Sequence, residues 1–267
     1  MTKRPFRTPH HTVSPVALVG GGASPMPGEI SLAHNGVLFL DEFPEFPRQV
    51  LEVLRQPIED RVITVSRAKY TVNYPANFML VASMNPCPCG YYGHPTKRCT
   101  CPGGAVQKYM SKISGPLLDR IDLQIEIEPV DFDAMADRKP GESSAAIRSR
   151  VMNARAVQQE RYKNIPGIYS NAQMNSRLLH EYAWPDEEGM KKLKERMTRL
   201  NMSARAFDRI LRVARTIADL DYSNRVRPDG SPEFTPAVAA ALPISVTHLT
   251  EAIGYRSLDR ASYGQTF

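Results

Sequence analysis

The chain has 267 residues, of which 42% are hydrophobic and 23% are charged, and its formal net charge is +6. This composition is typical of a soluble globular protein of one or two domains, and no apolar stretch reaches the ~20 residues needed to cross a bilayer. The start of the chain has no apolar signal segment, so we expect a cytoplasmic protein. The net charge permits a polyanionic partner without requiring one.

The first part of the chain predicts short elements around a buried strand. The first 35 residues are rich in Pro, Gly and His and predict loops with one short helix near 30–34. Residues 37–40 are wholly apolar, which is typical of a strand buried on both faces of a parallel sheet. Apolar residues then recur at helical spacing over 47–58, and we expect Pro57 to break or restart that helix.

Three further segments have the composition of strands. The β-branched and aromatic residues at 61–74 predict a hairpin with its tip at 66–69. Residues 78–83 predict a second buried strand, and the alternating sequence DRIDLQIEIEP (119–129) predicts a third. Strands that alternate with helices indicate an α/β layer architecture over 1–130.

The last part of the chain predicts a helical domain. A polar linker at 131–144 separates it from the first domain, and it covers 145–267. Its apolar spacing predicts four helices, at 145–162, 186–200, 203–220 and 247–255. The third has the clearest apolar stripe, with Ser203 as its expected N-cap.

Polar residues follow the predicted strands. Asp41 and Glu42 end the first strand, Asn85 follows the second, Arg120 precedes the third, and Arg205 opens a helix of the second domain. Ligands bind at the carboxyl ends of parallel strands, and adjacent carboxylates repel each other unless a cation or a polarised water uses them. Taken alone, the acidic pair also fits a strand that ends in a solvated turn.

Five segments are distinctive together: RPFRTPHHT, PGEISLAHNGVLFLDE, NPCPCGYYG, SGPLLDRIDL and HLTEAIGYRSLDR. They resemble the YifB/ComM family of magnesium-chelatase-like AAA+ ATPases over nearly the whole chain. The resemblance implies an incomplete AAA+ αβα core, with a parallel sheet that lacks the P-loop strand, followed by an all-α lid domain. It covers only about the second half of a family member.

The resemblance also implies roles for the polar residues. Asp41 would bind Mg²⁺ and Glu42 would orient the water that attacks ATP, which suits a reaction that depends on positioning and charge neutralisation. Asn85 and Arg205 would be the first and second sensors of the nucleotide. Arg120 would be an arginine finger that acts in trans on the neighbouring subunit, so a homo-oligomeric ring, expected to be a hexamer, is implied.

Each of these residues also has an ordinary structural explanation. Asn85 suits a turn, and Arg205 suits the solvated first turn of a helix. Arg120 could pair with Asp119 or Asp122.

An ATPase of this kind needs a P-loop of pattern G-x-x-x-x-G-K-[ST], and the 267 residues contain none. The Gly-rich segment VGGGASPMPG (19–28) has no Lys and lies on the wrong side of the motifs, so we do not expect it to replace the P-loop. We expect either a truncated or split gene product or a chain whose partner carries the P-loop, and we expect the chain alone to bind ATP poorly. The segment 223–243 is longer than expected in the lid.

Four cysteines form a C-x-C-x9-C-x-C cluster: Cys87, Cys89, Cys99 and Cys101. In a cytosolic protein such a cluster indicates metal ligation before disulfides, and four thiolates can hold one structural Zn²⁺, with His94 as an alternative ligand. The alternative is a loop of reduced cysteines.

The predicted hairpin tip carries Arg67 and Lys69. In a ring such tips would converge on a pore and contact DNA, although basic residues also keep exposed hairpins soluble. We expect His10 and His11 to be loop or packing residues.

Three functions remain open. The first is the C-terminal part of a ring-forming ATPase that couples ATP hydrolysis to DNA branch migration in DNA uptake and recombination, as the family implies for ComM-like members. The second is a magnesium chelatase subunit that drives metal insertion into a porphyrin. The third is an assembly module without a P-loop that donates Arg120 to a partner.

Overall fold

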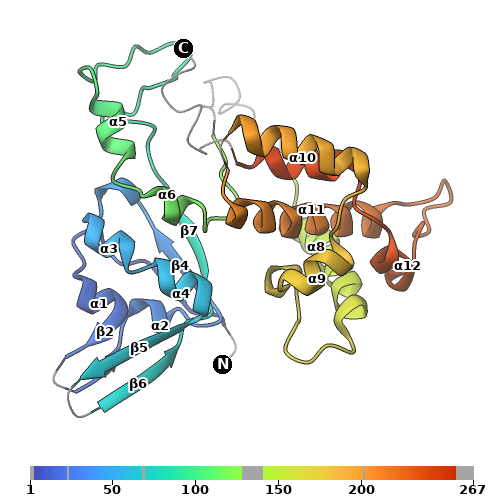
Figure 1. Cartoon of the computed structure of the whole chain (residues 1–267), viewed down its shortest axis with the longest axis horizontal. Coiled ribbons are helices and arrows are strands. Elements are labelled where there is room, and N and C mark those ends of the chain that lie inside the picture. Colours follow the sequence, from blue (N-terminus) through green and yellow to red (C-terminus); the bar gives the residue numbers. More distant parts are fainter. Residues whose placement is uncertain (1–2, 23, 68–69, 128–140, 201, 257–267) are drawn as a thin grey trace. The chain divides into compact units, whose positions relative to one another are not determined.

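The computed structural model describes residues 3–22, 24–67, 70–127, 141–200 and 202–256 (Figure 1). Contacts divide them into two units, one that ends at Ile121 and one that begins at Asp122. The expected linker at 131–144 lies mostly outside the described residues. None of the described helices combines the length and the apolar character that a membrane span requires.

A three-stranded parallel sheet forms the centre of the first unit. β4 (Val37–Leu40) lies between β1 (Phe6–Arg7) and β7 (Met79–Ala82) and pairs with both in parallel. The expected strand at 37–40 is thus confirmed, with Leu38 and Leu40 fully buried. Its other face is only half covered.

The strand expected at 78–83 is also present, but it is not buried. β7 pairs with β4 alone among the described residues, so it forms an edge of the sheet. Met79 is 58% exposed and Val81 is 37% exposed. The apolar sequence predicted burial because sequence alone does not distinguish an edge strand from a central one.

Short helices cover the sheet and supply much of the core. The remaining short elements of this unit are α1 (Pro15–Val19), β2 (Gly20–Gly21), β3 (Met26–Pro27), α2 (Glu29–Leu32), η1 (Phe43–Glu45), α3 (Arg48–Glu52), α4 (Arg55–Asp60), α5 (Ala105–Met110) and α6 (Gly115–Leu118). The expected helix over 47–58 breaks between Glu52 and Arg55, before Pro57. Pro57 occupies the first turn of α4, where a missing backbone N–H costs little.

The predicted hairpin is confirmed. β5 (Val62–Arg67) and β6 (Tyr70–Pro75) pair in an antiparallel register from Val62 and Pro75 to Arg67 and Tyr70. The hairpin extends away from the three-stranded sheet (Figure 1), and the Tyr74 hydroxyl anchors it by donating to the Pro25 carbonyl at 2.8 Å. Residues 68 and 69 at the tip lie outside the described residues.

The Gly-rich segment at 19–28 brings two backbone segments together. β2 pairs antiparallel with β3, and a Cβ atom on Gly28 would lie 2.4 Å from both the Gly20 nitrogen and the Leu18 carbonyl oxygen. Gly20 has a φ of 104°, which favours glycine. These glycines therefore allow the two backbone segments to approach each other closely.

The third expected strand, at 119–129, is wrong in its described part. Gln124 makes a single parallel bridge to Arg256, and no strand lies along the rest of the segment within the described residues. Its alternating apolar side chains are left exposed, at 48% for Leu123, 66% for Ile125 and 85% for Ile127. An alternating apolar sequence can adopt a strand, but the strand forms only where another strand is available to pair with its backbone.

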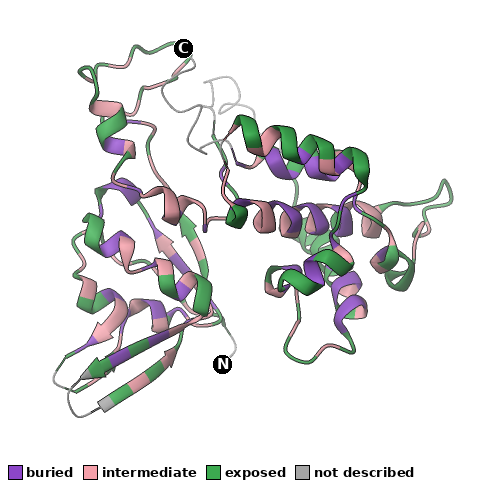
Figure 2. Ribbon diagram, viewed as in Figure 1, coloured by how far each residue is buried: buried purple, intermediate pink, exposed green. Residues whose placement is uncertain are grey.

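The second unit is helical, as expected, so the fold class is confirmed as an incomplete α/β core followed by a helical domain. Its elements are α8 (Ser144–Tyr162), η2 (Asn171–Gln173), α9 (Ser176–Tyr182), α10 (Glu187–Arg199), α11 (Ala204–Asn224), α12 (Pro236–Ala241) and α13 (Val246–Gly254). The four predicted helices are all present, and the Ser203 hydroxyl caps α11 by accepting from the Ala206 amide at 3.2 Å. Buried residues run along α11, which contacts α8, α9, α12 and α13 (Figure 2).

A buried charge cluster joins three of these helices. Asp219 on α11 is fully buried and accepts from Arg161 on α8 at 2.5 and 2.7 Å and from Arg215 at 3.1 Å. Asn171 donates to the same carboxylate at 2.8 Å. Arg215 also donates to the Leu242 carbonyl that follows α12, at 2.6 Å. One carboxylate therefore neutralises part of the charge of two buried guanidinium groups.

We predict that Asp219→Asn strongly destabilises the helical unit, because two buried guanidinium groups lose their counter-charge. The expected loss in the free energy of unfolding is about 3 to 5 kcal/mol. Urea unfolding followed by far-UV circular dichroism measures it. The control is Glu142→Gln, which breaks the half-exposed ion pair with Arg150, and it should cost less than about 1 kcal/mol. Equal effects of the two changes would contradict the prediction.

Candidate functional site

The acidic pair lies at the carboxyl edge of the sheet. Asp41 follows β4 directly, and its carboxylate accepts from the Ser83 hydroxyl, which follows β7, and from the Glu42 amide at 3.0 Å. Both acidic side chains are exposed. Because β4 and β7 run in parallel, the sheet brings Asp41 beside the segment that leads to Asn85.

Glu42 has an unusual backbone conformation. Its φ of 52° and ψ of 46° lie in the left-handed region, which costs a non-glycine residue roughly 1 to 2 kcal/mol. The turn redirects the chain into η1, whose Phe43 and Pro44 are buried. The Glu42 side chain thus stays at the surface while the following residues enter the core, and such strain at an exposed acid is a feature of functional sites.

A histidine contacts Glu42. The Nδ1 atom of His11 lies 3.3 Å from the Glu42 carboxylate, and the His11 ring packs edge-on against Phe46 with centroids 6.4 Å apart. The expectation that His11 is a loop or packing residue does not include this contact. The adjacent histidines were the available signal, but a loop histidine has no periodicity that points to a partner.

The two expected sensor residues are both exposed. Asn85 lies in the loop after β7, and Arg205 lies in the first turn of α11. Asn85 belongs to the first unit and Arg205 to the second. Their roles therefore remain expectations from the family.

Arg120, the expected arginine finger, is buried in an ion pair within the first unit. It is 8% exposed and donates to the Glu59 carboxylate from Nε at 2.9 Å and from Nη2 at 2.5 Å. Its Nη1 atom donates to the Pro116 carbonyl at 2.8 Å. The partner is Glu59 on α4, and not Asp119 or Asp122 as the ordinary explanation supposed. Arg120 and Glu59 line a cavity of about 450 Å³ beside α4 and β5.

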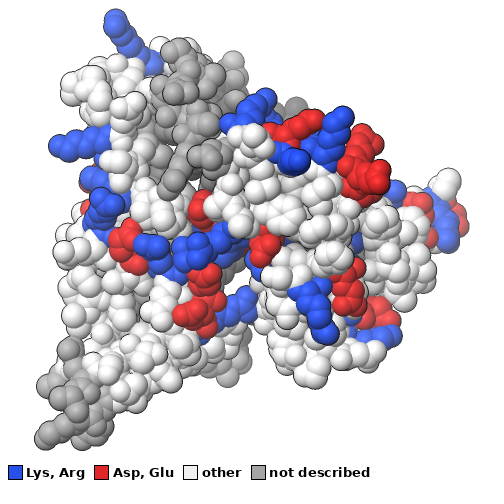
Figure 3. Space-filling model, in the orientation of Figure 1, with Lys and Arg blue, Asp and Glu red and all other residues white. Residues whose placement is uncertain are grey.

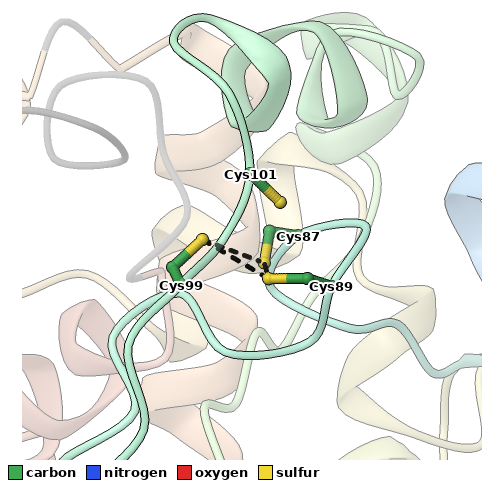
Figure 4. Close-up of side chains that lie close together, drawn as sticks. All are labelled: Cys87, Cys89, Cys99 and Cys101. Carbon is green, nitrogen blue, oxygen red and sulfur yellow. Dashed lines mark hydrogen bonds between the residues drawn. The ribbon is translucent and has the colours of Figure 1, made fainter.

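The four cysteines converge, as the spacing predicted (Figure 4). Their sulfur atoms all lie within 4.8 Å of one another, and three of the separations are 3.4, 3.5 and 3.7 Å. Tetrahedral ligation with metal–sulfur bonds of ~2.3 Å places sulfurs about 3.8 Å apart. None of the four is disulfide-bonded. This group of side chains can therefore hold a metal ion.

Backbone amides favour the thiolate at Cys89, whereas the pKa values of Cys99 and Cys101 are raised, because burial and the neighbouring sulfurs outweigh their own backbone hydrogen bonds. The Tyr92 amide donates to the Cys87 sulfur at 3.3 Å, and the Tyr91 amide lowers the pKa of the Cys89 thiol to about 5. A thiol must lose its proton to ligate a metal, so Cys89 is ready to bind near neutral pH. His94 lies outside the cluster, because its Nδ1 atom accepts from the Thr96 and Lys97 amides at 3.2 and 3.1 Å.

Of the two expected DNA-contacting residues, only the backbone of Arg67 is placed by the structure. The Arg67 backbone closes β5 opposite Tyr70, and Lys69 lies outside the described residues. Val65 on the same strand is buried, so the base of the hairpin belongs to the core.

Comparison with known proteins places these features in a family. Residues 1–135 match the family model of magnesium chelatase, subunit ChlI, and residues 141–231 match the model of the C-terminal part of that subunit. YifB of Escherichia coli (strain K12) is 44% identical over 260 residues, which are 97% of this chain and 46% of YifB. The competence protein ComM of Haemophilus influenzae is 43% identical over 261 residues, again 97% of this chain and 46% of ComM.

A further YifB, from Salmonella typhimurium, is 42% identical over 259 residues, with coverages of 97% and 46%. The chain thus spans less than half the length of the curated relatives it matches. The match to the ChlI model covers half of the chain and includes the acidic pair, the cysteines and Arg120. The chain belongs to the magnesium chelatase ChlI family and is similar along most of its length to the YifB and ComM proteins.

Proposed function

We propose that this chain forms the second part of an AAA+ ATPase of the YifB/ComM type, which assembles as a ring, expected to be a hexamer, and uses ATP hydrolysis to remodel DNA. The observation that carries the proposal is the acidic pair at the carboxyl edge of β4. Asp41 is exposed there to ligate Mg²⁺, and Glu42 is exposed beside it to orient a water. Phosphoryl transfer requires this combination of a metal ligand and a positioned acid.

ATP and Mg²⁺ are the cofactors of the proposed reaction. The phosphates would be bound mainly by a P-loop, and the 267 residues contain no G-x-x-x-x-G-K-[ST] pattern. The proposal therefore requires a P-loop from outside these residues. Asn85 and Arg205 would sense the nucleotide, and Arg120 would act in trans after it leaves Glu59.

DNA is the proposed substrate for two reasons. One relative carries the name competence protein, and the sequence has Arg67 and Lys69 at the expected tip of the hairpin. Cations on a ring of such hairpins would follow a phosphate backbone. A role in branch migration during recombination would fit this arrangement.

Zn²⁺ is the metal we propose for the cysteine cluster. Four thiolates at these separations suit a closed structural site, where zinc stabilises the fold and performs no chemistry. The cluster lies between Asn85 and α5, so the metal would fix the course of the chain that leads from the sheet edge toward Arg120.

Glu42→Gln should abolish turnover and leave ATP binding intact, because the amide keeps the shape of the side chain and loses its capacity to orient water as a base. The protein is the chain joined to the P-loop half of a family member. We expect steady-state hydrolysis to fall at least ~100-fold, with nucleotide binding measured by calorimetry. Glu45→Gln, which alters an exposed acid three residues later, is the control and should hydrolyse ATP normally. Normal turnover by Glu42→Gln would refute the assignment.

Metal analysis of the chain purified without chelators should find about one zinc per chain. Cys99→Ser removes one of the four ligands, so most of this zinc should be lost. His94→Ala should retain it, because His94 lies outside the group of four converging sulfurs and its Nδ1 atom accepts from backbone amides. Plasma emission spectroscopy measures the content, and zinc retained by Cys99→Ser would contradict the proposed ligand set.

The double change Arg67→Ala with Lys69→Ala should weaken DNA binding of the same joined protein. If both side chains contact duplex phosphates, the slope of log affinity against log salt falls by about 1.8. Fluorescence anisotropy over a salt series gives the slope. The control pair is Lys191→Ala with Lys192→Ala, two exposed positions on α10 that should leave it unchanged. An unchanged slope in the hairpin variant would remove the hairpin from the DNA-binding mechanism.

A further inference from the structure

The positive charge of this chain is concentrated in one segment. Between Asp60 and Asp119 the sequence contains no aspartate or glutamate, whereas the whole chain has 28. The same segment holds seven of the 34 basic residues, so the rest of the chain carries one more acid than base. The seven are Arg61, Arg67, Lys69, Lys97, Arg98, Lys108 and Lys112. The net charge of +6 therefore belongs to this segment alone.

Part of this charge lies on the loop between the cysteine pairs, which we call the cysteine loop (residues 87–101). Lys97 and Arg98 are exposed on it, and Lys108 is exposed on α5, which follows. Among the residues that the structure describes, these three basic side chains form no salt bridge, whereas Lys112 approaches Glu45 at 3.4 Å. In Figure 3 the outer part of this region, at the upper left, shows blue side chains and no red ones.

The cysteine loop is a built structure. The Cys87 carbonyl accepts from the Gly90 amide at 3.0 Å, and Gly90 and Gly93 have positive φ values of 81° and 78°, which suit glycine in tight turns. The His94 ring then accepts from two backbone amides and fixes the next turn. The four sulfurs hold the two ends of the loop together.

An exposed aromatic ring lies beside one of these cations. Tyr91 is 37% exposed, and Lys97 Nζ lies 5.1 Å from the centre of its ring. The His94 ring contacts Tyr91 edge-on, with centroids 5.7 Å apart, and so holds the tyrosine in place. An exposed tyrosine beside a cation is a combination that binds single-stranded nucleic acid, because bases stack on the ring while the phosphates contact the positive charges.

We propose that the cysteine loop is a second contact surface for nucleic acid, and that it binds a single strand through Lys97, Arg98 and Tyr91. This inference rests on the proposed action on DNA and adds a site that is separate in sequence from the hairpin. The absence of aspartate and glutamate from the sequence between Asp60 and Asp119 favours a polyanion over a protein with mixed charge. The bases of a nucleic acid can stack on the Tyr91 ring, whereas the side chains of an acidic peptide cannot, so the tyrosine favours a nucleic acid as the ligand.

The test uses the 267-residue chain and fluorescently labelled oligothymidine of about 30 nucleotides, with a duplex of equal length and polyglutamate as competitors. Lys97→Ala with Arg98→Ala should lower the salt slope by about 1.4, which corresponds to a loss of about 25-fold in affinity near 0.1 M salt. Tyr91→Leu should lower the affinity for the single strand at least about 5-fold and leave the slope unchanged, because stacking releases no counterions.

Lys191→Ala with Lys192→Ala is the control with the same charge change on another element. The proposal is overturned if this pair loses as much affinity as the loop pair, if the loop pair keeps the original slope, or if polyglutamate competes as well as DNA at equal charge. It is also overturned if the unaltered chain binds no DNA. Hydrolysis in the Glu42 experiment is measured without DNA, so the ATPase proposal is judged separately from the loop.

Discussion

The parallel pairing of β4 with β7 is the constraint on which the candidate site depends. Its register runs from Val37 and Met79 to Leu40 and Ala82, so both strands leave the sheet at one edge. The ladder then continues beyond the strands, because the Ser83 amide donates to the Leu40 carbonyl at 3.0 Å and the Phe43 amide donates to the Ser83 carbonyl at 2.9 Å. This backbone pairing, together with the hydrogen bond from the Ser83 hydroxyl, holds Asp41 opposite Ser83. The left-handed turn at Glu42 follows because the chain must enter the core at Phe43 while the acid stays in water.

Beyond that edge, a single run of chain connects the sheet, the cysteines and Arg120. Asn85 precedes the buried Cys87 by two residues, and α5 and α6 follow Cys101 before the chain reaches Arg120. Anything that orders the cysteine cluster therefore restrains the course of the chain on both sides of it. The ion pair of the buried Arg120 with the half-exposed Glu59 joins the end of this segment to α4, so the segment is fixed at the sheet, at the cysteines and at α4.

The sequence predicted those parts of the fold that have strong local signals. The four apolar residues of β4, the β-branched hairpin and the striped helix α11 were placed within a few residues of their observed bounds. The convergence of the cysteines followed from their spacing. The strand at 119–129 failed because pairing depends on a neighbour that composition does not reveal. The contacts of Arg120 with Glu59 and of His11 with Glu42 join residues far apart in sequence, and the buried Arg161 and Arg215 oppose the general tendency of charged groups to remain exposed.

Among the described strands β7 lies at the edge of its sheet, and this position affects the behaviour of the chain in solution. An edge strand offers unpaired backbone groups, and natural sheets protect such edges with charge, proline or a covering element. β7 has the sequence MLVA, with no charge and no proline, and it exposes Met79 and Val81. The edge thus has the composition of a template for adding another strand. Whichever segment occupies it, from the same protein or from a second copy, gains both backbone pairing and apolar burial, so the colloidal stability of the chain depends on that edge being covered.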